Sequence, residues 1–167
     1  HGAQCTFSGF FKYTGGGNGY WPALIRTKRE YNTEDGGFCS FLQGLDKVAF
    51  TGGGSTEWDQ YTLGIPSVAD WLAFSFVADN SDVKVYNKGV FLETVRTTSP
   101  VTDATTKIFV GYTKYNPGDS YYDEFRIRKA TSSAAWVKAE YETACDPSFA
   151  SYGAARKNSQ GLIFLIK

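Results

Sequence analysis

Residues 121–141 read YYDEFRIRKATSSAAWVKAEY, and this stretch changes its periodicity halfway along. In the first half apolar and charged residues alternate, which predicts a strand with one buried side and one solvent-facing side. The alternating residues are Phe125 and Ile127 on the apolar side and Glu124, Arg126 and Arg128 on the charged side. Asp123 shares the parity of the apolar residues. We therefore expect its carboxylate to point toward the core, where it needs hydrogen-bond donors or a cation.

The second half of the stretch has the signals of a short helix. Residues 131–133 read Thr-Ser-Ser, which are residues that favour the start of a helix. Beyond them Trp136, Val137, Glu140 and Tyr141 recur at helical spacing. The sequence therefore predicts a strand that is followed directly by a helix.

These two elements resemble the end of concanavalin-A-like jelly rolls, in particular the laminin-G-like branch found in bacterial surface and polysaccharide-processing proteins. The matching motifs are Asp-Glu-Phe-Arg-Ile at 123–127, Ser-Ala-Ala-Trp-Val at 133–137 and Glu-Tyr at 140–141. A weaker likeness covers residues 71–92, with Asn-Lys-Gly in place of an Asp-Gly turn. The resemblance implies an all-β, two-sheet antiparallel β-sandwich of the jelly-roll type with one short C-terminal helix. It also implies that Trp71 and Trp136 are core residues.

The rest of the chain fits one domain over residues 1–167. Short alternating segments between glycine-rich turns predict further strands. We expect strands at 6–13, 23–29, 37–43, 47–51, 71–77, 83–86, 90–92 and 107–112. The apolar segment 161–166 also suits a buried strand. We expect it to fill the place of a strand that the resemblance puts before residue 6, unless the chain is a piece of a longer surface protein.

Composition argues against several classes of protein. The formal net charge is zero, without the basic excess of a nucleic-acid-binding domain. The longest apolar run, residues 161–166, is too short to span a bilayer. The chain contains no Met and no signal peptide, which is typical of a mature or excised domain. The resemblance implies a secreted or cell-surface protein.

Three cysteines leave two interpretations open. Cys5, Cys39 and Cys145 are an odd number, so they do not all pair within the chain. Cys5 and Cys145 lie toward opposite ends of the sequence, and jelly-roll termini often meet, so one interpretation is a disulfide between them. The other is three unpaired thiols, since cysteine is among the residues most often buried.

Few residues support catalysis. The only histidine is His1, at the terminus, whereas Ser-His-Asp and Cys-His catalysis need a positioned base. Glu57 and Asp59 match half of a strand-borne acid pattern of polysaccharide-cleaving enzymes, but the third acid is missing. A glycosidase needs two carboxyl groups about 5 to 9 Å apart. We therefore expect a protein that is not an enzyme, with a glycoside hydrolase or polysaccharide lyase as a minor alternative.

Aromatic residues beside glycine-rich loops favour sugar binding, because a flat ring with a polar tip suits a wet site. The candidate ligand-binding residues are Tyr20, Trp21, Trp58, Asp59, Tyr115 and Asn116. The predicted function is a non-catalytic carbohydrate-binding module of an extracellular enzyme or adhesin, with a polysaccharide or glycan as its partner. The alternative is a structural surface or filament subunit in which these rings pack on protein.

The resemblance also implies a structural calcium ion, which takes several oxygen ligands. Asp123 is the candidate metal ligand, because it matches the motif and shares the inward parity.

Overall fold

The computed structural model is a β-sandwich with one helix in the part of the chain that it describes. The described residues are 4–15, 23–26, 38–43, 47–52, 59–62, 71–97, 110, 119–146, 148, 156–158 and 161–163.

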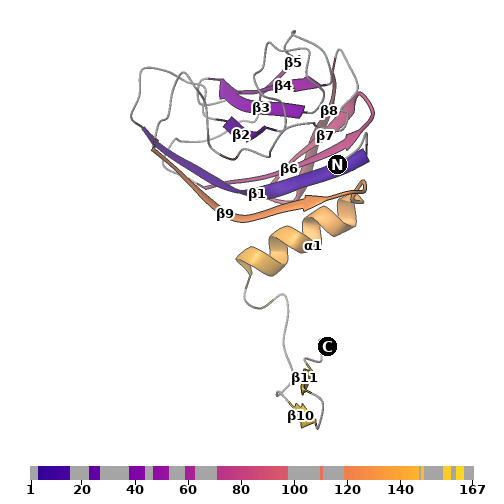
Figure 1. Cartoon of the computed structure of the whole chain (residues 1–167). Helices are drawn as coiled ribbons and strands as arrows, with labels where there is room; N and C mark the ends of the chain where they lie inside the picture. The colour runs from indigo at the N-terminus through magenta and orange to yellow at the C-terminus, as the bar shows by residue number, and fades with distance from the viewer. Residues whose placement is uncertain are drawn as a thin grey trace.

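The larger of the two sheets that form the sandwich has five strands in the order β8-β7-β6-β1-β9. All neighbouring strands in it are antiparallel (Figure 1). Its strands are β1 (Gln4–Gly15), β6 (Leu72–Asp79), β7 (Asp82–Asn87), β8 (Val90–Arg96) and β9 (Asp119–Arg128). Strand β1 therefore lies between β6, from the middle of the sequence, and β9, from its second half. The pairing of β1 with β6 and β9 joins distant parts of the sequence in one sheet.

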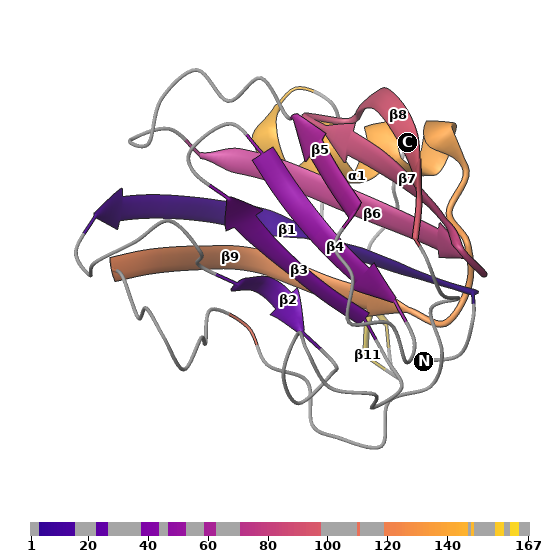
Figure 2. The ribbon, with the colours of Figure 1, turned by 90° about the horizontal axis from the view of Figure 1, so that it is seen from above.

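The second sheet has four antiparallel strands in the order β2-β3-β4-β5. Its strands are β2 (Ala23–Arg26), β3 (Phe38–Gln43), β4 (Lys47–Gly52) and β5 (Asp59–Thr62). Seen from above, this sheet lies over the five-stranded one (Figure 2). The two layers are the arrangement that the resemblance implied.

The core lies between these two layers. Phe7, Phe74 and Phe76 of the larger sheet and Val48 and Phe50 of the smaller one are almost fully buried. The rings of Phe50 and Phe76 meet edge to face across the layers, with centroids 4.9 Å apart. The predicted all-β, two-sheet sandwich is therefore confirmed.

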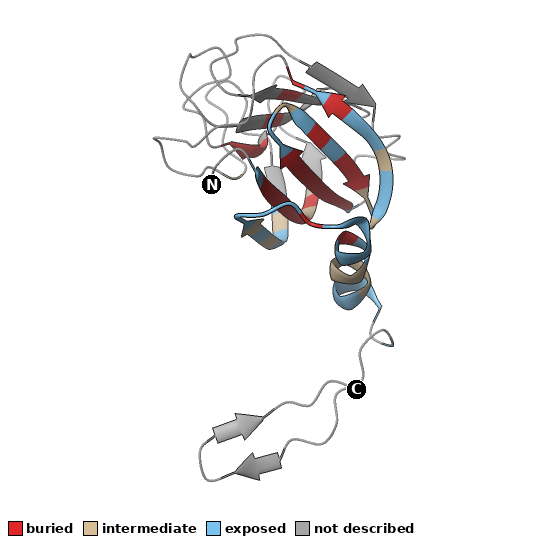
Figure 3. Ribbon diagram, turned by 90° about the vertical axis from the view of Figure 1, so that its right-hand side faces the viewer, coloured by how far each residue is buried: buried red, intermediate tan, exposed pale blue. Residues whose placement is uncertain are grey.

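One helix, α1 (Ala134–Cys145), lies on the other face of the five-stranded sheet, which we call the outer face (Figure 1). Ser133 caps it as predicted, because its side chain accepts a hydrogen bond from the Trp136 N–H at 3.2 Å. Only Val137 of the helix is buried, against Val77 and Tyr86 of the sheet. In Figure 3 the buried residues accordingly concentrate in the strands, whereas α1 is mostly intermediate or exposed. Within the described residues, no helix has the length and apolarity to cross a membrane.

Two core assignments were wrong. Trp71 is 42% exposed and Trp136 is 48% exposed. In each case the next residue in the chain is the buried one. Leu72 takes the inward position in β6, and Val137 takes the position under the helix. The two indoles therefore lie at the surface and are available for another role.

The disulfide between Cys5 and Cys145 is also excluded. Cys5 is buried in the core between the sheets, whereas Cys145 is exposed in the last turn of α1, and the two are not joined. The sheet itself separates the two sulfur atoms. The side chain of Cys39 lies outside the described residues.

The described part of the apolar segment 161–166 does not pair with either sheet of the sandwich. This part, β11 (Gly161–Ile163), pairs with β10 (Arg156–Asn158) in a separate two-stranded sheet. Only two residues separate these strands, and so short a connection favours pairing between neighbours in the sequence. The other predicted strands are present with ends shifted by a few residues, except 107–112, which falls outside the described residues.

The burial pattern predicts a clear difference between two aromatic substitutions. Phe76→Ala should lower the free energy of unfolding by about 3 to 5 kcal/mol, because it opens a cavity between the sheets. Trp71→Ala should cost less than about half of that, because burial energy scales with the apolar area removed from water. Urea unfolding of both variants checks this. Equal losses would contradict the exposed position of Trp71.

Burial of Tyr86 under α1 raises the pKa of its phenol. The folded state therefore keeps this proton at a pH where the unfolded chain has lost it. Stability that depends on Tyr86 is fully present below about pH 10 and falls as the pH rises through the folded pKa. Urea unfolding between about pH 8 and pH 11 should show a steeper loss for the natural chain than for Tyr86→Phe. Parallel curves would contradict this burial effect.

Candidate functional site

One irregularity in β9 determines which side chains reach the outer face. Ser8 of β1 is paired with Arg126, but Phe10 is paired with Asp123, so β9 contains one extra residue between these pairs. Glu124 lies in this bulge with a φ of 50°, a left-handed conformation that is uncommon for residues other than glycine. The alternation of side chains is therefore reset at Glu124.

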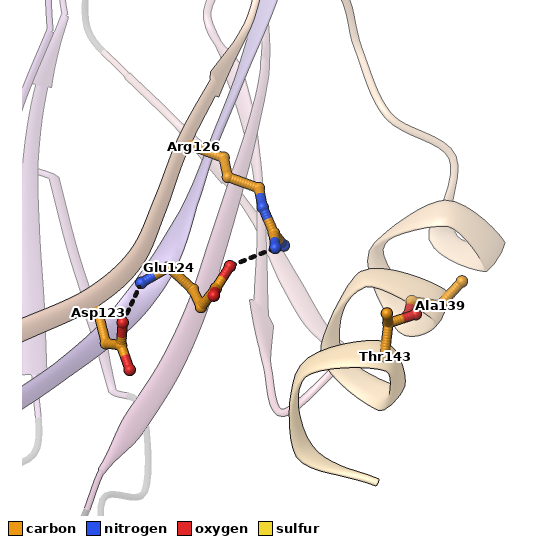
Figure 4. A network of polar contacts seen from close by, with 5 residues as sticks. All are labelled: Asp123, Glu124, Arg126, Ala139 and Thr143. Carbon is orange, nitrogen blue, oxygen red and sulfur yellow. Dashed lines mark hydrogen bonds and ion pairs between the residues drawn. The ribbon is translucent and has the colours of Figure 1, made fainter. Parts of the chain in front are cut away.

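The bulge explains why the inward prediction for Asp123 was wrong. Tyr122, just before it, packs against the core, with its ring 5.1 Å from that of Phe11. Phe125, just after the bulge, also packs against the core. Between them Asp123 and Glu124 are both exposed, and the Asp123 Oδ1 accepts a hydrogen bond from the Glu124 N–H at 2.8 Å (Figure 4). Two consecutive carboxylates thus face outward.

For the expected calcium site the described residues provide one candidate ligand, Asp123. Calcium takes six to eight oxygen ligands. Asp123 is an exposed carboxylate with one oxygen already engaged by the backbone. Across the described part of the chain, no group of three or more His, Cys, Asp or Glu residues is placed to hold a metal ion.

A hollow of about 390 Å³ lies between β9 and α1 on the outer face. It is lined by Thr6, Ser8, Arg126, Ile127, Arg128, Trp136 and Glu140. Thr6 fixes the chain at this point, because its hydroxyl donates to the Ala130 carbonyl at 2.8 Å and accepts from the Ser132 N–H at 2.9 Å. The turn from strand to helix is therefore held rigidly to β1.

Trp136 and Arg128 form a stacked pair at this hollow. The Arg128 guanidinium lies 4.2 Å from the centre of the indole, within cation–π distance. The guanidinium also donates a long hydrogen bond of 3.5 Å to the Ser132 hydroxyl. Trp136 remains 48% exposed, so much of its ring is open beside positioned polar groups.

Charged groups continue along the strand and the facing helix. Arg126 forms an ion pair with Glu124, and both side chains extend from β9 toward α1 (Figure 4). Glu140 of the helix lines the hollow, and its Oε2 is buried without a hydrogen-bond partner in the described structure. A buried acceptor of this kind costs free energy until a donor reaches it. A ligand hydroxyl is one such donor.

Beyond the C-terminal end of α1 the outer face carries exposed aromatic residues. Lys12 of β1 is paired with Tyr121 of β9, and the pairing of Phe11 with Leu72 brings Trp71 into line on the other side of Lys12. Trp71 is 42% exposed and Tyr121 is 57% exposed. Figure 1 shows that α1 ends before it reaches the end of the sheet at which β9 begins. We refer to the outer face from Trp136 and Arg128 to Tyr121, with Lys12 and Trp71 alongside, as the β9 strip.

Most residues proposed from the sequence cannot be compared with this strip. Tyr20, Trp21, Trp58, Tyr115 and Asn116 lie outside the described residues. Asp59 begins β5, and its side chain is likewise not described. Their role in binding therefore stays a prediction.

Sequence reasoning missed the strip itself, although one signal for it was present. Arg126 and Arg128 alternate with core residues, and the helix that follows the strand brings Trp136 to the same face. Because Trp136 was assigned to the core, the sequence did not indicate that its ring lies beside the two arginines.

Comparison with known proteins supports the fold. No family model and no curated protein matches the chain. Among solved structures, the receptor-binding domain of botulinum neurotoxin type G is similar, with a TM-score of 0.61 and 10% identity over 85% of this chain and 38% of that one. The binding domain of Paraclostridial Mosquitocidal Protein 1 has a TM-score of 0.63 and 12% identity over 86% of this chain and 38% of that one.

A third similar structure is the ligand-binding domain of botulinum neurotoxin serotype D in complex with N-acetylneuraminic acid. Its TM-score is 0.64 and its identity 10%, over 84% of this chain and 36% of that one. The chain thus spans little more than a third of the length of these neighbours. At such identities the likeness establishes the sandwich fold.

The left-handed conformation of Glu124 gives a prediction for the strip. Glu124→Gly should leave stability unchanged or raise it by roughly 0.5 to 1 kcal/mol, because glycine adopts a positive φ without steric cost. The ion pair that is lost with Arg126 is exposed and contributes little. Glu124→Val should destabilise, because a branched side chain is strained at this φ. Urea unfolding distinguishes these outcomes, and a larger loss for glycine than for valine would contradict the bulge.

Proposed function

We propose that this chain is a non-catalytic carbohydrate-binding module and that the β9 strip binds the sugar. The observation that carries the proposal is Trp136, a large aromatic ring left 48% exposed next to a hollow lined by polar groups. A sugar ring presents an apolar C–H face to such an indole, and its hydroxyls need polar partners at the rim.

The polar partners are present at short range. Arg128 is held against the indole, and Arg126 and Glu140 line the same hollow. Together they offer guanidinium donors and a carboxylate acceptor, which is the combination that hydroxyl groups require. The rigid turn at Thr6 holds these groups in place before a ligand arrives, which reduces the entropy lost on binding.

The described part of the site supports binding more than catalysis. Glycoside hydrolysis needs an acid and a second carboxylate on opposite sides of one glycosidic bond. Glu124, one of the carboxylates of the strip, is already paired with Arg126, and the Asp123 carboxylate is exposed to water. We therefore propose that the strip binds sugar without cleaving it.

The wider setting is also part of the proposal. Two observations support a module that acts outside the cell, as part of a larger surface protein, adhesin or enzyme. They are the laminin-G-like resemblance and the receptor-binding role named for the similar domain of botulinum neurotoxin type G. The loop residues Trp21 and Trp58 remain candidates for further sugar contacts. A structural calcium ion is a further part of the proposal, with Asp123 as one of the several oxygen ligands that it would need.

Loss of the indole should weaken binding without unfolding the protein. Trp136→Ala should reduce retention on a polysaccharide column about tenfold, since a stacked ring contributes roughly 1 to 3 kcal/mol by analogy with base stacking. Phe91→Ala is the matched control, because Phe91 is also 48% exposed but lies on β8, at the opposite edge of the sheet. Equal retention of both variants, with unchanged circular dichroism, would rule out Trp136 as a sugar contact.

A further inference from the structure

We infer that the β9 strip takes an extended, uncharged polysaccharide chain, not a single charged sugar at the end of a glycan. This inference rests on the proposed function and adds the class of ligand to it. It follows from the length of the strip, the position of its aromatic rings and the balance of its charges.

The length of the strip exceeds that of one sugar. Arg128, beside Trp136, and Tyr121 lie seven positions apart in β9. Without the extra residue of the bulge, and at about 3.3 Å per residue, this corresponds to about 20 Å along the strand. Aromatic rings are thus present at both ends, with charged side chains between them. A chain of several sugar units can contact both ends at once.

The far end of the strip can support more than one unit. Tyr121 of β9 and Trp71, the residue just before β6, lie on either side of Lys12 of β1. Two interstrand spacings separate them by about 10 Å. Both rings are exposed, and the Phe10 ring, stacked on Tyr141 at 6.3 Å, borders them on the helix side.

The strip also lies at a sheet edge. Among the described strands, β9 is the last of the five-stranded sheet, and none is paired with its outer side. The middle units of a polymer can therefore contact this edge while the rest of the polymer extends past both ends of the strip. A site for a chain terminus would need a closed end.

The charges of the strip cancel. Lys12, Arg126 and Arg128 provide three cations, while Asp123, Glu124 and Glu140 provide three carboxylates. Arg126 is already neutralised by Glu124, and Arg128 lies over the indole of Trp136. A polyanion would meet as many carboxylates as cations along this surface. Hydroxyl groups, in contrast, can donate to the carboxylates and accept from the guanidinium groups.

The test begins with the natural chain and a panel of immobilised polysaccharides. Neutral probes are cellulose, xylan, mannan and chitin, and anionic probes are polygalacturonate and a sialylated glycan. We expect retention on at least one neutral polymer, with affinity that changes little from about 50 mM to about 500 mM salt, because screening weakens only charge-driven contacts. Retention on the anionic probes alone, lost at high salt, would overturn the inference but leave glycan binding in place. Retention on no probe would overturn the proposed function itself.

A length series then tests the two ends separately. With oligosaccharides of the retained polymer, affinity should rise from the disaccharide to the hexasaccharide. Tyr121→Ala and Trp71→Ala should each lower the affinity for the hexasaccharide about tenfold and leave the disaccharide unaffected. Trp136→Ala should weaken both, and Tyr121→Phe, which keeps the ring, should behave as the natural chain. Equal affinities for the two lengths, or no effect at Tyr121 and Trp71, would overturn the extended site.

Discussion

The extra residue in β9 is the feature on which the outer face of this domain depends. Before Glu124 the strand turns Tyr122 into the core, and after it Phe125 and Ile127 point the same way. A uniform strand does not place Tyr122 and Phe125, three positions apart, on one face, because side chains alternate. The left-handed Glu124 resolves this conflict and leaves two carboxylates, those of Asp123 and Glu124, on the surface. Core packing is thus compatible with a polar outer strip.

The helix completes this arrangement by covering only part of the same face. Val137 fills the apolar position over Val77 and Tyr86, which fixes α1 to the inner strands of the sheet. Among the described residues, the helix therefore leaves the edge strand β9 uncovered, and Trp136 is stacked on Arg128 there instead of being buried. The same packing that stabilises the helix leaves a hollow along the edge.

Much of this fold could be predicted from residue patterns, whereas the site could not. The alternation at residues 124–128 and the cap at Ser133 gave the right elements, because both depend on local spacing. Asp123 was placed on the wrong face because a bulge shifts parity by one residue and leaves no clear mark in the sequence. Trp136 was misplaced because helical spacing does not determine whether it or its neighbour Val137 is buried. That choice depends on tertiary packing.

The central claim is that sugar binds along β9, on the outer face of the five-stranded sheet. The most direct test is an NMR titration of the natural chain with an oligosaccharide of a retained neutral polymer, observing the four indole N–H signals. Assignment by single Trp→Phe variants identifies each signal. The account predicts that the signals of Trp136 and Trp71 shift together on binding. Shifts confined to Trp21 and Trp58, with Trp136 and Trp71 unchanged, would place the site in the loops and contradict it.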